Sequence, residues 1–310
     1  MNTCGTVRAE QCDLLLSLDY RPTYEAVCWA APRTPLIVWV HDPRPAEDIE
    51  KIKTLKVPGS EETVPRGIRT INCTSLRRIA GFSQVIARPV VFGAPAMCLV
   101  EKIPGTYGVK APPVTFLPNI INEGPVRIEK HARPRVIFLG RLDPIKRPWI
   151  FAELAKEFPH IEFLFLGQAH FRTEGTWNPD NLPGNVRLMG HVDGEEKAQL
   201  LSSAWVLVNT SIHEALPISF LEALTHETPI LSCQDPEGVA TRFGVYVGRW
   251  DGTGLAGRAA FQQGLERLVE DASLRRRLGR EGREWVRTNH SREGFLRGFK
   301  ELCQRAKVLT

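Results

Sequence analysis

Short apolar runs alternate with longer helical patterns along most of this chain. The runs lie in the segments DLLLSLDY, PLIVWVHDP, VIFLGRLDP, IEFLFLGQ, VRLMGHV, AWVLVNTS, TPILSC and GVYVGRW. They are apolar on both faces, which is typical of strands in a parallel sheet that helices cover on each side. The alternation of such strands with helices predicts doubly wound α/β domains.

One segment, LPNIINEGPVRIEKHARPR at 117–135, interrupts this alternation with proline, glycine and charged residues. The sequence therefore predicts a Rossmann-like N-terminal domain over 1–124 and a Rossmann-like C-terminal domain over 125–290. A terminal helix over 291–310 is expected to pack back on the N-terminal domain. Helical patterns within the second half cover 148–158, 194–203, 263–279 and 291–308.

The N-terminal domain contains few predicted strands. Three or four runs precede the boundary, whereas doubly wound domains usually have five or six strands. We therefore expect a truncated domain with an uncovered sheet edge and at least one uncovered helix face. Because such surfaces recruit partners or aggregate, the chain is expected to self-associate or to need a companion chain.

The charge of the chain is concentrated near its C-terminus. The net charge is +5, but residues 272–310 carry eleven Lys and Arg against four Glu, so they sum to +7 and the rest to −2 (5 − 7). This stretch is either the solvated surface of helices or a basic face toward anionic lipid or a phosphorylated acceptor. We expect no nucleic-acid partner.

Cysteine usage and hydropathy bear on the compartment. The seven cysteines are scattered without a Cys-x-x-Cys pair, which favours free thiols in a reducing cytoplasm over disulfides or a zinc site. The longest apolar runs, LIVWV and AWVLV, are strand-sized and far shorter than a membrane span. The sequence thus predicts a cytoplasmic protein whose membrane contact, if any, is peripheral.

The segment HEALPISFLEAL places two glutamates, Glu214 and Glu222, around the start of a helix. Pro217 suits the first helical position, because its missing N–H is no loss there. The free N–H groups of that first turn favour an anion such as a diphosphate. Since carboxylates repel phosphate, the glutamates are expected to bind the hydroxyls of a ribose and of a sugar. Either glutamate taken alone also fits a solvated surface position.

The segment LGRLDPIKRP follows a predicted strand directly, at the edge where doubly wound sheets bind ligands. Arg141 and Lys146 in this segment could neutralise a diphosphate, and Gly140 would let the backbone approach a ligand closely. Two charges on an exposed turn are the alternative interpretation.

These segments together resemble glycosyltransferase family 4, the group 1 retaining enzymes of the GT-B fold. The resemblance runs from about Pro118 to the end and uses LPN, GRLDPIKRP, GHV, EALPISFLE and TPIL, in the order typical of the family. It implies that Arg141 and Lys146 grip the donor diphosphate. It also implies that Glu214 lies near the donor sugar and that Glu222 binds the ribose.

The same resemblance implies further donor-binding residues. Backbone groups of Ala215, Leu216 and Pro217 would meet the phosphates and the sugar, and His191 with Val192 would border the base. His191 alone also fits an ordinary surface or core histidine.

The first half resembles the family over the segment PLIVWVHDPR, where the family has a strand that ends in a histidine near the reacting sugar. This implies a catalytic role for His41, with Asp42 beside it, although a turn or helix cap would look alike. The family's opening strands and Gly-rich acceptor loop have no match here.

The predicted activity is transfer of a sugar from a nucleoside diphosphate sugar to an acceptor hydroxyl, with retention at the anomeric carbon. The acceptor is a sugar, a lipid-linked sugar or a small molecule, and neither a cofactor nor a metal is expected. Two alternatives stay open: a catalytically incomplete nucleotide-sugar-binding half-enzyme that needs a partner chain, and a GT-B sugar-nucleotide 2-epimerase.

Overall fold

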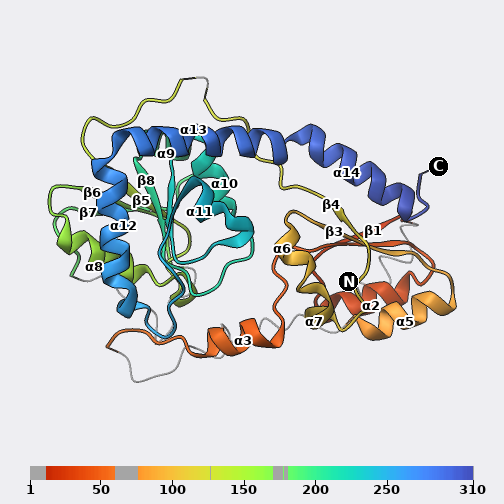
Figure 1. Cartoon of the computed structure of the whole chain (residues 1–310). Coiled ribbons are helices and arrows are strands. Elements are labelled where there is room, and N and C mark those ends of the chain that lie inside the picture. Colours follow the sequence, from red (N-terminus) through yellow and green to blue (C-terminus); the bar gives the residue numbers. More distant parts are fainter. Residues whose placement is uncertain (1–11, 60–75, 126, 170–176, 178–180, 310) are drawn as a thin grey trace. The chain divides into compact units, whose positions relative to one another are not determined.

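The computed structural model describes residues 12–59, 76–125, 127–169, 177 and 181–309. They form two compact units, each built on its own parallel sheet (Figure 1). Unit 1 is drawn from 1–49, 71–120 and 290–310, and unit 2 from 50–70 and 121–289. Two parallel sheets with helices between their strands confirm the predicted α/β class.

The sheet of unit 1 has four parallel strands in the order β1-β2-β3-β4, which agrees with the three or four runs in the sequence. The elements of unit 1 are β1 (Leu15–Leu18), α2 (Pro22–Ala30), β2 (Leu36–Trp39), α3 (Ala46–Lys53, which continues into unit 2), α5 (Arg77–Val85), β3 (Val90–Ala94), α6 (Met97–Val100), α7 (Ile103–Tyr107), β4 (Val114–Phe116) and α14 (Arg292–Arg305). Strands β2 and β3 are buried at nearly every position, as their continuous apolar runs predict.

Helix α14 packs on β3 and β4 within unit 1. Leu302 of this helix joins a buried cluster with Ile37 and Leu117. The helix lies close to the sheet because Gly298 has no side chain: a Cβ there would come 2.4 Å from the carbonyl oxygen of Phe116. The apolar stripe of a basic helix is therefore used for packing.

The sheet of unit 2 has six parallel strands in the order β10-β9-β8-β5-β6-β7. Its elements are β5 (Arg135–Leu139), α8 (Pro148–Glu157), β6 (Glu162–Leu166), β7 (Val186–Gly190), α9 (Gly194–Ser203), β8 (Val206–Asn209), α10 (Ile218–Thr225), β9 (Ile230–Ser232), α11 (Val239–Phe243), β10 (Gly244–Tyr246), α12 (Arg258–Glu270) and α13 (Ala272–Asn289), with short 3₁₀ turns at Pro144–Lys146, Pro236–Gly238 and Leu255–Gly257. Helices α8 and α9 match the predicted ranges to within one residue.

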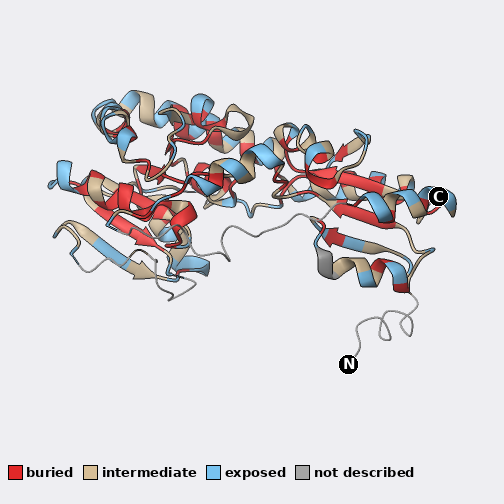
Figure 2. Ribbon diagram, turned by 90° about the horizontal axis from the view of Figure 1, so that it is seen from below, coloured by how far each residue is buried: buried red, intermediate tan, exposed pale blue. Residues whose placement is uncertain are grey.

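The strand order places a topological switch point between β5 and β8. The chain first adds β6 and β7 on one side of β5, then returns to add β8, β9 and β10 on the other. Strands β5, β6, β8 and β9 are largely buried and appear red in Figure 2, whereas the edge strand β7 is not. In open sheets of this kind, ligands bind outside the carboxyl ends of the strands at the switch point.

The predicted single helix over 263–279 is wrong, because the chain breaks between α12 and α13 at Asp271. The backbone there leaves the helical region, with φ −88° and ψ 87°. The Asp271 carboxylate accepts a hydrogen bond from the Leu274 N–H at 2.8 Å, which caps the start of α13.

Every helix in the described ranges is too short or too polar to cross a bilayer.

Unit 2 also takes part of its core from residues that precede β5 by many positions. Ile52, Leu55 and Val57 are buried in the same cluster as Phe138, Trp149 and other side chains of unit 2. The apolar pattern of 50–57 therefore serves the second sheet.

Candidate functional site

Two loops meet at the switch point of unit 2. One follows β5 and covers residues 140–147, and the other follows β8 and covers residues 210–217. The Ile212 N–H donates to the carbonyl of Ile145 at 2.9 Å, so the two loops are joined through their backbones. This junction holds most of the residues that the sequence singles out.

The centre of the junction is the Glu214 carboxylate, whose side chain is only 7% exposed. Its Oε1 atom accepts from Lys146 Nζ at 2.6 Å, from Ser211 Oγ at 2.6 Å and from Asn209 Nδ2 at 2.9 Å. Among the described residues, none of the hydrogen bonds reaches Oε2. The structure thus brings Lys146 and Glu214 together and leaves one carboxylate oxygen available to a ligand.

The charge state of Glu214 follows from these contacts. Burial would raise the pKa of the carboxyl, but the Lys146 ammonium and the hydrogen bonds from Lys146, Ser211 and Asn209 outweigh burial and lower it. Glu214 is therefore an ionised acceptor of hydrogen bonds at neutral pH. Its charge is balanced from within the protein before any ligand arrives.

Arg147 holds the two loops together through buried hydrogen bonds. Its fully buried guanidinium donates to the carbonyls of Thr210 at 2.7 Å, Ser211 at 3.1 Å and Trp250 at 2.6 Å, and to Cys233 Sγ at 3.2 Å. The residue has φ 47° and ψ 55°, in the left-handed region that non-glycine residues rarely adopt. A cation held this way positions Lys146, its neighbour in the chain.

Thr210 completes this anchor from the other loop. Its hydroxyl donates to the carbonyl of Lys146 at 2.6 Å and to that of Arg147 at 3.0 Å. The backbone that carries Lys146 is thus tied to the loop that leads to Glu214. This double connection explains how the charges of Lys146 and Glu214, which are far apart in the sequence, stay close together.

Arg141 lies outside the Glu214 network. Its guanidinium is 52% exposed and pairs with Asp143 of the same loop at 3.1 Å. The structure therefore places the two members of the predicted basic pair differently: Lys146 is held by Glu214, whereas Arg141 is close to solvent. A half-exposed guanidinium remains available to an anionic ligand.

Gly167 permits a close backbone approach within the protein at the start of this loop. A Cβ on Gly167 would come 2.0 Å from the carbonyl oxygen of Gly140, whereas a Cβ on Gly140 would meet only Phe138 at 3.8 Å. The Gly140 N–H also donates to the carbonyl of Leu166 at 3.0 Å. The start of the Arg141 loop is therefore set against the end of β6, backbone to backbone.

Helix α10 begins one residue later than predicted. Pro217 has the φ of −63° that proline imposes, but its ψ of 127° is extended, so it precedes the helix as the N-cap and Ile218 is the first helical residue. Ala215 is partly buried, and Leu216 is 7% exposed. These three residues connect the Glu214 carboxylate to the free N–H groups of α10.

Glu222 lies on α10 and is held by a second lysine. Its Oε1 is 2.7 Å from Nζ of Lys197, which belongs to α9. His191 and Val192 precede α9: the imidazole is 70% exposed and lies 3.6 Å from Asp193, and Val192 is buried. The two predicted glutamates are thus each paired with a lysine from another element.

His41 belongs to unit 1, where it follows β2. Its backbone N–H and that of Asp42 donate to the Asp19 carboxylate at 2.7 and 3.0 Å, and the Tyr107 hydroxyl donates to the same group at 3.1 Å. The imidazole packs against the Trp39 ring, and burial lowers its pKa despite the nearby Asp19 and Asp42 carboxylates. His41 is therefore a mostly neutral side chain on a loop that Asp19 fixes.

Sequence reasoning missed several residues of these networks. Asn209 and Ser211 come directly after the apolar run AWVLV, at a carboxyl end, so their position was a usable signal. Asp19 likewise directly follows an apolar run, at the carboxyl end of β1. Lys197 sits in a polar stretch that resembles solvated surface and gave no signal. Arg147 was inside the quoted basic segment but reads there as one more surface cation.

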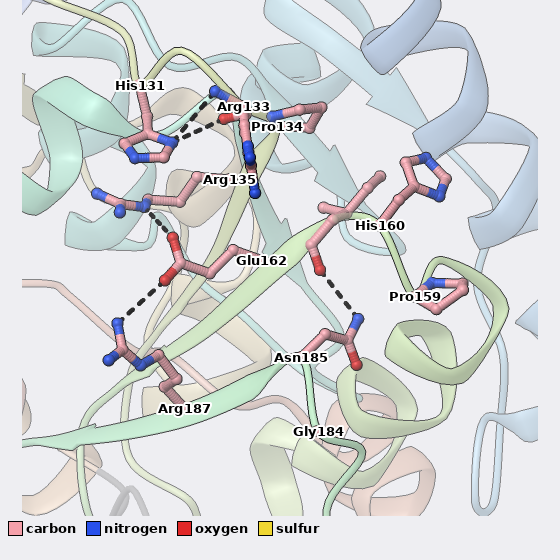
Figure 3. A pocket seen from close by; sticks show the side chains of 11 residues that line it. His131, Arg133, Pro134, Arg135, Pro159, His160, Glu162, Gly184, Asn185 and Arg187 are labelled. Atoms are coloured by element: carbon pink, nitrogen blue, oxygen red, sulfur yellow. Dashed lines mark hydrogen bonds and ion pairs between the residues drawn. The ribbon is translucent and has the colours of Figure 1, made fainter.

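A separate pocket of about 510 Å³ lies at the opposite end of the strands (Figure 3). Glu162 bridges Arg135 at 2.6 Å and Arg187 at 3.2 Å across the starts of β5, β6 and β7. Burial would raise the pKa of Glu162, but the two guanidiniums lower it overall. None of the predicted site residues lines this pocket, and its ion pairs join neighbouring strands.

Comparison with known families identifies the segment that carries the junction. The family model described as glycosyl transferases group 1 matches residues 123–285, which is more than half of the chain. The matched segment contains all the predicted site residues except His41.

Two curated proteins share sequence with part of the chain. An alpha-galactosylglucosyldiacylglycerol synthase of Streptococcus pneumoniae is 30% identical over 144 residues, which are 40% of this chain and 38% of that protein. A glycosyltransferase 1 domain-containing protein 1 of Xenopus tropicalis is 25% identical over 156 residues, which are 49% of this chain and 43% of that protein. The chain thus covers less than half the length of these relatives.

Solved structures resemble nearly the whole chain. A sucrose-phosphate synthase from Thermosynechococcus elongatus has a TM-score of 0.71 at 17% identity, and the matched region spans 99% of this chain and 77% of the synthase chain. The Anabaena protein HepE, solved with UDP-glucose, has a TM-score of 0.68 at 14% identity, and the matched region spans 99% of this chain and 82% of the HepE chain. At such identities the likeness concerns the fold.

Proposed function

The chain belongs to the group 1 glycosyl transferases and has their GT-B fold, as its sequence predicts. We propose that it is a retaining hexosyltransferase. It moves a sugar from a nucleoside diphosphate sugar to an acceptor hydroxyl. The bond between the anomeric carbon and the diphosphate oxygen breaks, and the acceptor oxygen bonds to the same face. The acceptor proton passes to an oxygen of the departing phosphate.

The observation that carries this proposal is the Glu214 network at the switch point. A carboxylate that is 7% exposed and charged needs strong internal donors, and three converge on its Oε1. The remaining oxygen can accept from hydroxyls of a donor sugar. Such a fixed acceptor beside the start of α10 suits a ligand with a sugar on one side of a diphosphate.

Positive charge next to this acceptor would stabilise the leaving group. We assign this role to Lys146, Arg141 and the free N–H groups of α10. Preorganised donors aimed at developing charge are usually the largest catalytic contribution, because they need no reorganisation during the reaction. The Arg147 and Thr210 contacts supply such preorganisation for Lys146. We expect no metal and no cofactor to take part.

The remaining site residues are assigned to recognition of the donor. Glu222 on α10 binds the ribose hydroxyls, and His191 with Val192 borders the base. The mostly neutral imidazole of His41 contacts the reacting sugar as a hydrogen-bond partner, because burial keeps it uncharged. These roles follow the family resemblance of each position.

Uridine diphosphate sugars are the first donors to test, because HepE was solved with UDP-glucose. A lipid-linked sugar is the first acceptor to test, because the Streptococcus relative is named as a synthase of a glycosyl diacylglycerol. The basic stretch at 272–310 would suit peripheral contact with anionic lipid.

The decisive experiment incubates the purified full chain with a panel of UDP, GDP and ADP sugars and candidate acceptors. Product is followed by mass spectrometry, and the new anomeric linkage is assigned by nuclear magnetic resonance. We expect transfer with the donor's anomeric configuration preserved. An inverted linkage would contradict the retaining mechanism, and donor epimerised without acceptor would contradict transfer itself.

A further inference from the structure

We propose that Lys197 is a positioning residue for Glu222 and thereby sets how strongly the site selects ribose over deoxyribose. This inference rests on the proposed function, which assigns Glu222 to the ribose. It adds a residue that neither the family resemblance nor the quoted motifs single out. Its basis is the pairing of α9 with α10.

The two side chains meet across neighbouring helices. Lys197 lies in the first turns of α9 and Glu222 near the middle of α10, with Nζ 2.7 Å from Oε1. The side chains are 28% and 23% exposed, so the pair is partly screened by protein yet reachable from solvent. Partly buried pairs hold their geometry better than fully solvated ones.

Lys197 is the one cation that α9 offers. The sequence of this helix is GEEKAQLLSS, and its other charged residues are Glu195 and Glu196. Without the lysine, Glu222 would face a helix whose first turn is acidic. Like charges on adjacent elements repel, so the carboxylate would swing away.

Other basic side chains in this region have other partners. The His226 ring bonds only the backbone carbonyl of Glu222, at 2.8 Å. Lys130 Nζ donates to the carbonyl of His226 and to Thr228 Oγ1, both at 2.8 Å. Within the described part of the chain, Lys197 is therefore the side chain that bonds the Glu222 carboxylate.

The pairing leaves a defined role for each carboxylate oxygen. Lys197 holds Oε1, so Oε2 keeps a fixed direction and can accept from ribose hydroxyls. A carboxylate that is already ordered loses less freedom on binding, and preorganisation of this kind raises affinity. The benefit appears only when the hydroxyl is present, so it acts on selectivity.

Isothermal titration calorimetry on the full chain tests this. UDP, GDP and ADP are each measured beside their 2′-deoxy counterparts, and the tightest pair is taken forward. The variants are K197M, K197R, E222Q and K197M/E222Q. We expect K197M to reduce the ribose-to-deoxyribose affinity ratio about three- to tenfold, and K197R to retain most of it. E222Q should abolish the ratio, and the double variant should match E222Q.

The matched control is K156M. Lys156 forms an ion pair with Glu153 within α8, at 2.5 Å, and the side chains are 51% and 32% exposed. Removing it should leave the affinity ratio unchanged, and thermal melting should show that all variants fold. A merely structural lysine would change stability without changing the ratio.

Each contrary result has its own meaning. If K197M keeps the wild-type ratio while E222Q loses it, the role of Lys197 is overturned and the proposed function stands. If E222Q keeps the ratio, the ribose assignment fails and the role of Lys197 fails with it. If the wild type binds none of the three diphosphates, both the proposed function and this inference are overturned.

Discussion

Lys146 and Glu214 are 68 residues apart in the sequence, yet the ammonium lies 2.6 Å from the carboxylate. The pair joins the loop after β5 to the loop after β8, across the switch point of the sheet. A donor diphosphate placed there would meet a lysine whose charge is already shared. Ligand binding then depends on how Lys146 divides its hydrogen bonds between Glu214 and phosphate.

Replacing Lys146 should separate catalysis from stability. K146M is expected to lower kcat/KM about a hundredfold or more through lost leaving-group stabilisation. It should also lower the free energy of unfolding by about 3 kcal/mol, because Glu214 is left charged and nearly buried. Urea unfolding and transfer kinetics check the two effects. The double variant K146M/E214Q should recover the free energy of unfolding but not the activity. If the double variant is as unstable as K146M, the buried charge of Glu214 is not the cause of the instability.

Arg141 should behave differently because it is half-exposed. R141A is expected to cut turnover about a hundredfold and to weaken nucleoside diphosphate binding. The free energy of unfolding should fall by about 1–2 kcal/mol, because R141A removes one partner of the 7% exposed Asp143 carboxylate. Calorimetry with the diphosphate decides: unchanged affinity would show that Arg141 does not contact it.

Gly167→Ala should disturb the start of the Arg141 loop. The new methyl would come 2.0 Å from the Gly140 carbonyl oxygen, and φ is 147° there, so backbone must move. We expect a loss of about 2–4 kcal/mol in unfolding free energy and weaker donor binding. Gly184→Ala is the matched control, because nothing lies within 4 Å of its Cβ position. Equal stability of the two variants would contradict the close approach.

Unit 1 should lose stability in mild acid through His290. Burial lowers the pKa of this 2% exposed imidazole to about 4, although a hydrogen bond with the Asn119 backbone opposes the shift. The unfolded chain binds a proton near pH 6.5, so stability is full above that pH and is lost as pH falls toward 4. Between pH 7 and 5 the contribution amounts to about 2 kcal/mol. The free energy of unfolding of H290Q, measured with urea, should lack this dependence on pH. An equal pH dependence in the wild type and in H290Q would contradict the prediction.

Chelation should leave transfer intact. If Lys146, Arg141 and the α10 N–H groups supply the positive charge for the leaving diphosphate, EDTA should change kcat by less than about twofold. Added Mg²⁺ should have an equally small effect. Loss of activity on chelation, with recovery on adding a divalent cation, would assign that charge to a metal.

The sequence predicted the fold class well because strand and helix periodicity is local. The runs at 136–139 and 206–208 are buried strands, as their apolar residues required. The break at Asp271 was missed because the flanking helical pattern continues through it, and one capping carboxylate decided the outcome. Similarly, nothing local shows that Ile52 and Leu55 join the core of unit 2.

The candidate site was predictable only in part. Lys146 and Glu214 were visible as charges in the loops after strands, but their direct contact depends on sheet order. The buried Arg147 was not distinguishable from a surface cation, since its role arises from carbonyls in two other segments, at 210–211 and at Trp250. Long-range hydrogen bonds of this kind leave no pattern in the neighbouring residues.

The path of the chain between its two units limits how the protein can be divided. Residues near 50–57 leave unit 1 for the core of unit 2, the chain returns, and it passes to unit 2 again after 120 and back at 290. A fragment that starts at residue 121 would carry α14 without the sheet it packs on, and would lack Ile52 and Leu55. Neither unit is therefore encoded by one continuous stretch, and recombination between relatives at a single crossover would exchange parts of both units.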